Sequence, residues 1–160
     1  MVASFGGGYI NHPAAGPFGI RVARPTAALP QTGTASIYRV SGGRCAIYLV
    51  GMFTAAADAT VTTLQVVNTT TGAAADRGAT TNLSSATAIT SSPIGASLAL
   101  ANTVGGALNT AGGAIVMQMT PHLANIGTID LTTSASNAAA RVRWVLYYVP
   151  IDIGAYVSVA

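Results

Sequence analysis

The chain has 160 residues, a length that fits one domain with a core large enough to need no disulfide or metal support. Only 7% of the residues are charged, the net charge is +3, and every basic residue is Arg and every acidic residue Asp. The seven arginines are spread along the chain, so nothing here indicates a nucleic-acid-binding protein. A surface so poor in Lys and Glu predicts an assembly subunit covered by other chains. The alternative is a soluble monomer rich in Ala and Thr.

Residues 1–35 differ from the rest because Gly and Pro recur throughout them. The recurring Gly and Pro residues exclude a long helix or a central strand. The apolar residues spaced between them predict an extended arm that lies along a surface. That surface belongs either to a partner chain or to the arm's own domain. The candidate contact residues of the arm are Phe5, Tyr9, Ile10, Phe18, Arg21 and Arg24.

The first strands of the main domain follow the arm. Residues 36–40 form a short β-rich run, and Gly42 and Gly43 after it predict a hairpin turn. The next run, residues 44–53, is apolar on both faces, which predicts a central strand buried on both sides. Gly51 within it is interpreted as a β-bulge.

The middle of the chain is a series of shorter strand signals separated by Thr, Ser, Ala and Gly. Residues 60–67 alternate, and residues 83–90 and 97–103 carry weaker strand patterns. Residues 114–120 and 127–133 are firmer strand candidates.

The longest strand signal is residues 141–149, and it contains the one Trp of the chain. Alternation places Val142, Trp144, Leu146 and Tyr148 on a core face. The opposite face becomes apolar from Val145 onward, so it needs cover, and we expect that cover to be an oligomer interface. This predicted interface consists of Arg141, Arg143, Val145, Tyr147 and Val149.

A proline ends that run, and residues 155–159 read as a closing strand. Many short strands with frequent turn signals and no amphipathic helix predict an all-β fold. We expect residues 36–160 to form an antiparallel β-sandwich or a jelly-roll-like barrel, and residues 1–35 to form the extended N-terminal arm.

The sequence offers little for catalysis. None of the common nucleophile, phosphate-binding or zinc-binding motifs is present. His12 and His122 each lie beside a proline, which predicts that both are loop residues, and Cys45 in an apolar run is interpreted as a small core residue. Four isolated aspartates predict neither a calcium site nor a carboxylate pair. We therefore expect no enzymatic activity, no cofactor and no metal.

The N-terminal residues lack the pattern of a secretory signal, and no apolar run reaches the length of a membrane span. The sequence therefore predicts no membrane partner.

Two segments carry a resemblance to a known group of proteins. IYRVSGGRCAIYLVGMFTAAADATVTTLQVVNTTTG and GTIDLTTSASNAAARVRWVLYYVPIDIGAYVSVA resemble small virion proteins of tailed bacteriophages. The shared features are an early VSGG turn, a middle rich in Thr and Ala, and a terminal W-x-L-x-Y-x-P-x-D-x-G-A-x-V segment. In this chain that segment consists of Trp144, Leu146, Tyr148, Pro150, Asp152, Gly154, Ala155 and Val157. Ile153 departs from the pattern, where a second acid is expected.

The resemblance implies a capsid decoration, or cement, protein made in the bacterial host cytoplasm. Proteins of this kind form β-rich trimers on the outer capsid surface, and their partners are the major capsid protein and copies of themselves. Two alternatives remain open at this point: a tail, baseplate or head-fibre component that contacts the host, and a carbohydrate-binding β-sandwich.

Overall fold

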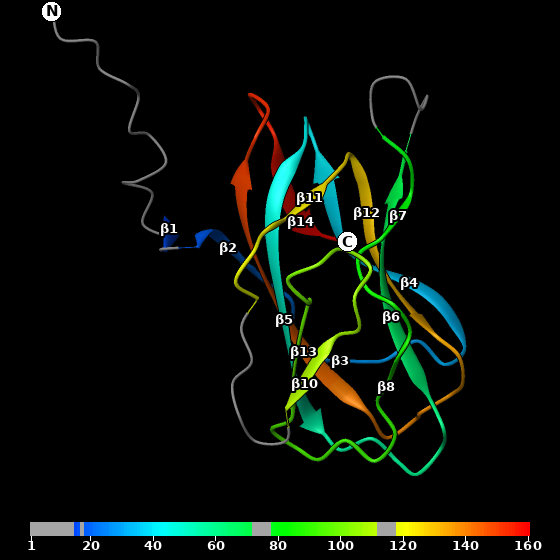
Figure 1. Cartoon of the computed structure of the whole chain (residues 1–160). Coiled ribbons are helices and arrows are strands. Elements are labelled where there is room, and N and C mark those ends of the chain that lie inside the picture. Colours follow the sequence, from blue (N-terminus) through cyan, green and yellow to red (C-terminus); the bar gives the residue numbers. More distant parts are fainter. Residues whose placement is uncertain (1–14, 17, 72–77, 112–117) are drawn as a thin grey trace, which may run out of the picture.

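The computed structural model describes residues 15–16, 18–71, 78–111 and 118–160. Two antiparallel sheets pack face to face, which confirms the prediction of an all-β antiparallel sandwich (Figure 1). Of the sandwich and barrel alternatives the fold is the sandwich, because within these ranges no strand of one sheet pairs with a strand of the other.

Sheet A runs in the order β1-β2-β13-β5-β9-β10, with β11 on β5 and β3 on β13. Strands β9 and β11 occupy the same edge of β5, one at each end. The strands of sheet A in the described residues are β1 (Ala15–Gly16), β2 (Gly19–Ala23), β3 (Ala27–Ala28), β5 (Cys45–Ala55), β9 (Ser97–Ala99), β10 (Asn109–Ala111), β11 (His122–Ala124) and β13 (Arg141–Pro150).

Sheet B runs in the order β14-β4-β12-β6-β7, with β8 on the other end of β6. Its long strands are antiparallel neighbours, and β12 lies between β4 and β6. The strands of sheet B in the described residues are β4 (Gly33–Ser41), β6 (Thr63–Thr70), β7 (Thr81–Asn82), β8 (Thr87–Ala88), β12 (Gly127–Thr133) and β14 (Tyr156–Val159).

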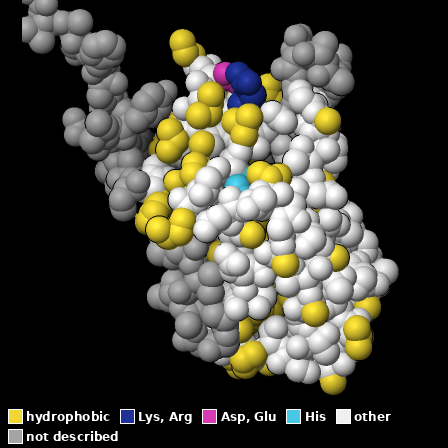
Figure 2. All heavy atoms as spheres, in the orientation of Figure 1, with side chains coloured by type: hydrophobic (Ala, Val, Ile, Leu, Met, Phe, Trp, Pro, Cys, Tyr) yellow, Lys and Arg dark blue, Asp and Glu magenta, His cyan; other side chains and the backbone are white. Residues whose placement is uncertain are grey.

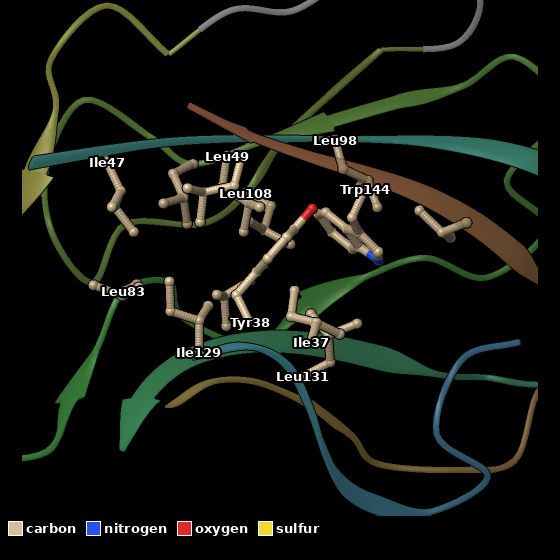
Figure 3. Close-up of a cluster of buried hydrophobic side chains, with 14 of the residues drawn as sticks. Ile37, Tyr38, Ile47, Leu49, Leu83, Leu98, Leu108, Ile129, Leu131 and Trp144 are labelled. Atoms are coloured by element: carbon tan, nitrogen blue, oxygen red, sulfur yellow. The ribbon is translucent and has the colours of Figure 1, made fainter. Parts of the chain in front are cut away.

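The core lies between the two sheets (Figure 3). Trp144 and Leu49 enter it from sheet A, and Tyr38 and Ile129 enter it from sheet B. All four are essentially inaccessible to solvent. The prediction that Trp144 lies on a core face is therefore confirmed.

The pair β5–β13 is the longest strand pair among the described residues and runs from Cys45 opposite Pro150 to Ala55 opposite Arg141. The predicted bulge at Gly51 is wrong, because Gly51 lies directly opposite Trp144 in regular register. The register shifts instead at the other end of the pair, between Arg141 and Val142. Glycine is required at position 51 for packing, since a Cβ there would lie only 2.7 Å from the Trp144 ring.

The predicted hairpin at Gly42 and Gly43 is also wrong. The turn leaves β4 in sheet B and enters β5 in sheet A, so the strands that it joins do not pair with each other. The residues that signal a tight turn are the same in both cases, because φ > 0 is needed whether the chain folds back or crosses between sheets. Both glycines do have positive φ, +73° and +156°.

Other predicted strands agree in part with the structure. Strand β12 matches the predicted residues 127–133, and β6 begins three residues later than predicted. The predicted strand 83–90 contains only the two-residue strand β8, after β7 has ended. Of the predicted strand 114–120, residues 114–117 lie outside the described residues, and β11 was not predicted.

Part of the predicted arm belongs to sheet A. Strand β2 pairs with residues 145–148 of β13, and β3 pairs with residues 141–142. The hydroxyl of Tyr38 also donates a hydrogen bond to the carbonyl of Val22 (3.3 Å), which ties β2 to sheet B. This segment therefore packs on its own domain, while residues 1–14 lie outside the described residues.

Replacing Gly51 with Ala tests the close contact with Trp144. Alanine normally stabilises an extended backbone relative to glycine, but here its Cβ meets the indole. We expect Gly51→Ala to lower the free energy of unfolding by about 1–3 kcal/mol in urea titrations. The loss should be smaller in a Trp144→Phe background, and an equal loss in both backgrounds would contradict this explanation.

Candidate interaction surface

Two turns that carry the motifs of the sequence lie side by side at one end of the sandwich (Figure 1). Residues 41–44 join β4 to β5, and residues 151–155 join β13 to β14, so both turns cross from one sheet to the other. Their flanking strands pair in both sheets, through β14 on β4 and β13 on β5. We call these two turns together the corner.

The corner is held by an ion pair between Arg44 and Asp152. The guanidinium donates from Nε to Oδ2 and from Nη2 to Oδ1, each at 2.9 Å, and the Arg44 backbone N–H donates to Oδ2 at 2.8 Å. These hydrogen bonds lower the pKa of the Asp152 carboxyl to about 2. The forked geometry fixes the orientation of the turn, although the pair is partly exposed and adds little stability.

Backbone contacts tighten the corner further. The N–H groups of Ile151 and Ala155 donate to the carbonyls of Arg44 (2.9 Å) and Asp152 (3.1 Å). Gly42 has a left-handed φ of +73°, and a Cβ on it would overlap the carbonyl oxygen of Gly154. The two turns therefore approach each other more closely than other residues would permit.

The outer face of sheet A contains the predicted oligomer interface. Strand β13 alternates as expected, with Trp144 and its neighbours on the core face buried and the opposite face accessible. On that opposite face Arg141 and Arg143 are exposed, Val145 and Tyr147 are half-buried, and Val149 is 44% exposed. The structure thus places all five predicted interface residues on one surface.

Residues predicted for the arm lie on the same surface. The ring of Phe18 packs edge-on against Tyr48 of β5 and Tyr147 of β13, with centroid distances of 5.5 Å and 5.9 Å. Arg21 lies opposite Tyr147 in the register of β2 with β13. Part of the cover that the strand needs therefore comes from its own chain.

The outer face changes in character along the strands. Near the corner, Leu123 of β11, Ala46 of β5 and Val149 of β13 form an apolar row across three neighbouring strands. At the other end the face carries exposed arginines of β13. We call the whole surface the outer face of sheet A.

A shallow cavity of about 360 Å³ lies beside the arginine end. Arg24 and Arg143 line it together with residues 23, 25 and 26. In the described part of the chain the only salt bridge is Arg44–Asp152, so neither of these two guanidinium groups is paired with a described carboxylate. This end of the face can accept anionic groups from outside.

Three predicted contact residues of the arm, Phe5, Tyr9 and Ile10, lie outside the described residues. The sequence analysis named Ile153 only as a departure from the resemblance pattern and did not predict that Ile151 and Ile153 are exposed apolar residues of the corner. Their signal was present in the pattern P-x-D-x-G, in which both variable positions hold isoleucine although turns are usually polar.

His122 is not a loop residue, contrary to the sequence-based prediction. It lies on β11 opposite Ile47 and is buried, and by geometric criteria neither of its ring nitrogens hydrogen-bonds to another described residue, although the backbone of Ala101 lies close enough to act on its charge. Burial lowers the pKa of its imidazole, because the interior disfavours the charged form. Pro121 was interpreted as the end of the preceding strand and the start of a loop, but strand β11 begins directly after it. His12 lies outside the described residues.

Cys45 is confirmed as a buried core residue. It is inaccessible to solvent, and burial raises the pKa of its thiol to about 11, which keeps it protonated and unreactive. Asp130 is also buried. Its Oδ2 accepts a hydrogen bond from the Thr128 hydroxyl at 3.1 Å, and its Oδ1 has no partner among the residues that the structure describes. Within the described ranges, no three His, Cys, Asp or Glu side chains gather closely enough to hold a metal ion.

Comparisons with protein-family models, curated proteins and solved structures found no match to this chain. The described residues also contain no helix of the length and apolarity that a membrane crossing requires.

The buried imidazole of His122 makes stability depend on pH. Its folded pKa lies below the unfolded value of about 6.5, so on acidification the unfolded chain binds the proton first. We expect the free energy of unfolding to fall as pH drops below about 6.5, by at most about 1.4 kcal/mol per pH unit. Urea titrations from pH 7.5 to 5 measure this slope.

The variant His122→Leu should lose the slope, and His12→Gln should keep it. The Asp152 carboxyl also makes stability depend on pH, but only below the range of these titrations. Its folded pKa is lowered to about 2, so the stability that it contributes is lost as the pH falls from its unfolded pKa of about 4 toward 2. A slope that persists in His122→Leu would show that another group is responsible.

Proposed function

We propose that this chain is a non-enzymatic structural protein of a tailed-bacteriophage virion. It binds the outer surface of the assembled capsid as a homo-oligomer, most simply a trimer, and stabilises the shell by bridging capsid subunits. The resemblance of the VSGG and P-x-D-x-G-A segments supports this proposal, and the two segments meet at the corner. The proposed partners are the major capsid protein and copies of the chain itself.

The observation that carries the proposal is the contrast between the two outer faces. In sheet B the central strands β4 and β12 present mainly polar groups to solvent, including a hydrogen bond between the Thr34 and Thr132 hydroxyls at 2.8 Å, and the exposed large apolar side chains, Tyr156 and Val159, lie on β14. Sheet A presents Val145, Tyr147 and Val149, with Tyr48 opposite Tyr147. Because one sheet of the same domain is suited to water and the other is not, the outer face of sheet A is the surface that another chain covers.

The composition of this face suits a protein partner. Arg, Tyr and Met are enriched at protein interfaces, whereas Lys and Glu are depleted. The face contains Arg143, Tyr147 and the exposed Met52, and the chain has no Lys or Glu at all. We therefore assign self-association to the outer face of sheet A.

Stabilisation of the shell follows from mass action. A protein that binds only the assembled capsid lowers the free energy of that state by RT ln(1 + c/Kd) at each site, where c is the concentration of the free protein. An oligomer gains further because its second and third contacts form at high effective concentration. Each copy therefore needs only modest affinity. The N-terminal residues Phe5, Tyr9 and Ile10, which precede β1, are assigned to contact the shell.

Binding to capsids tests the proposed function directly. Purified protein is mixed with empty expanded heads and with unexpanded proheads, and the bound fraction is measured by co-sedimentation. We expect saturable binding to expanded heads alone. Deletion of residues 1–14 should leave the fold intact and weaken binding, since it removes the three apolar contacts but spares β2 and β3. Failure of the full chain to bind either particle would refute the proposal.

A charge on the outer face of sheet A tests self-association. Val149 is 44% exposed, so Val149→Asp should fold, but a carboxylate in an apolar interface should dissociate the oligomer. Val159 on sheet B is 41% exposed, and Val159→Asp is the matched control. Sedimentation velocity should show a smaller species for Val149→Asp only. Identical behaviour of both variants and the native chain would exclude this face as the interface.

A further inference from the structure

Beside Arg143, the segment that pairs with β13 makes a local detour. Strand β2 ends opposite Val145, and β3 resumes opposite Val142. Residues 24–26 between these two strands therefore lie opposite only residues 143–144 of β13, so the segment must bulge away from its neighbour. The cavity of about 360 Å³ lies at this bulge and is lined by Arg143 and by the bulging segment.

The backbones of the two arginines that line this cavity are held in place. The N–H of Arg24 donates to the carbonyl of Trp144 at 2.9 Å, which anchors the start of the bulge to β13. Pro25 fixes its own φ and restricts the residue before it to extended conformations. Arg143 lies opposite Met52 in the regular register of β5 with β13. Both arginines are therefore positioned before any ligand binds.

The guanidinium groups of Arg24 and Arg143 share the cavity without a described carboxylate to balance them. Like charges that line one cavity repel each other, so an anion that contacts both lowers the electrostatic energy. The described carboxylates are engaged elsewhere: Asp152 binds Arg44, Asp130 accepts from the Thr128 hydroxyl, and Asp58 accepts from the backbone N–H of Thr60. Figure 2 shows the contrasting arrangement at the corner, where basic and acidic side chains lie together.

The donors of the cavity suit a doubly charged oxyanion. Each guanidinium offers a planar fork of N–H groups that matches two oxygens, and Thr26 adds a hydroxyl to the lining. One fork already matches a carboxylate, whereas a terminal phosphate group has three free oxygens and a charge of about −1.5 to −2 at pH 7. A phosphate group therefore matches the two arginines in charge and in its number of acceptors. Because the cavity is shallow, the anion stays partly hydrated and the affinity is modest.

We infer that Arg24 and Arg143 form a binding site for the phosphate group of a small molecule, either inorganic phosphate or a phosphomonoester. The two ligands share the chemistry that the cavity recognises, and they differ in what lies beyond the phosphate. The site does not depend on attachment to a capsid, so the purified protein alone is sufficient to test it.

The experiment titrates the native protein with sodium phosphate and with glycerol 3-phosphate at pH 7.5 and constant ionic strength, followed by nitrogen-15 NMR. We expect saturable shifts of the backbone amide of Thr26 and of the Nε–H groups of Arg24 and Arg143, with a dissociation constant in the millimolar range. Sodium acetate is the singly charged control, and it should bind at least about fivefold more weakly. Tighter binding of glycerol 3-phosphate than of phosphate would identify a phosphomonoester as the ligand, and equal binding would identify the free ion.

Matched substitutions separate the site from the general positive charge of the chain. Arg24→Gln and Arg143→Gln should each weaken phosphate binding at least about fivefold, because each removes charge-assisted hydrogen bonds. Arg141→Gln removes an exposed arginine on the same face of β13 that does not line the cavity. Arg39→Gln removes the arginine of a smaller cavity, of about 120 Å³, on sheet B. These two controls should bind phosphate within about twofold of the native chain, and circular dichroism should show that all four variants are folded.

Several outcomes would overturn the inference. Shifts that grow without saturation, or acetate binding as tight as phosphate binding, would show that the cavity does not select a phosphate group. An equal loss in Arg141→Gln and Arg143→Gln would replace the site with a diffuse positive field. A short DNA duplex that binds the same two arginines more tightly than glycerol 3-phosphate would make the partner a nucleic acid. Failure of the chain to bind capsids would leave the phosphate titration unchanged, so the two proposals fail independently.

Discussion

The pairing of β5 with β13 is the interaction on which the rest of the structure depends. It places Trp144 over Gly51 on the inner side, which fills the centre of the core. On the outer side it aligns Tyr48 with Tyr147 and creates the apolar surface to which Phe18 adds its ring. At its Cys45–Pro150 end it brings together the two turns of the corner. Core, outer face and corner are thus three consequences of one register.

The two outer faces explain how the chain can have so few charged residues. The hydroxyl and amide groups of sheet B can form hydrogen bonds with water, so this face does not need Lys or Glu to be hydrated. Between Val145 and Val149 the outer face of β13 and β5 in sheet A has only the phenolic hydroxyls of Tyr147 and its neighbour Tyr48 as polar side-chain groups. The few ions are used at defined places: one pair fixes the corner, and Arg141 and Arg143 mark the far end of the outer face. This contrast between the two faces is the basis on which we propose that another chain covers sheet A.

Local patterns in the sequence were sufficient for the strands with strong alternation. The alternation of residues 141–149 identified both faces of β13, because a period of two has only one arrangement in an extended strand. The sequence could not show that residues 19–23 would pair with this strand, since that contact joins segments more than a hundred residues apart. The same limit explains Gly51, whose reason for being glycine is the distant Trp144.

The candidate surface was predictable to a similar extent. Alternation was enough to place the five residues of the predicted interface on one face of β13, whereas the placement of Phe18 and Arg21 on the same face required the fold. Turn residues indicated a tight turn at Gly42 and Gly43, but turn chemistry does not distinguish a hairpin from a crossing between sheets. For that reason the corner, which needs both crossings, became visible only in three dimensions.

Hydroxyl-radical footprinting of the native protein at low and high concentration tests the central claim most directly. The claim is that a second chain covers the outer face of sheet A. It predicts that labelling of Val145, Tyr147 and Val149 falls as the concentration rises, while labelling of Tyr156 and Val159 on sheet B stays constant. Equal labelling of both sets at every concentration, from a protein that remains a single protomer, would contradict the account.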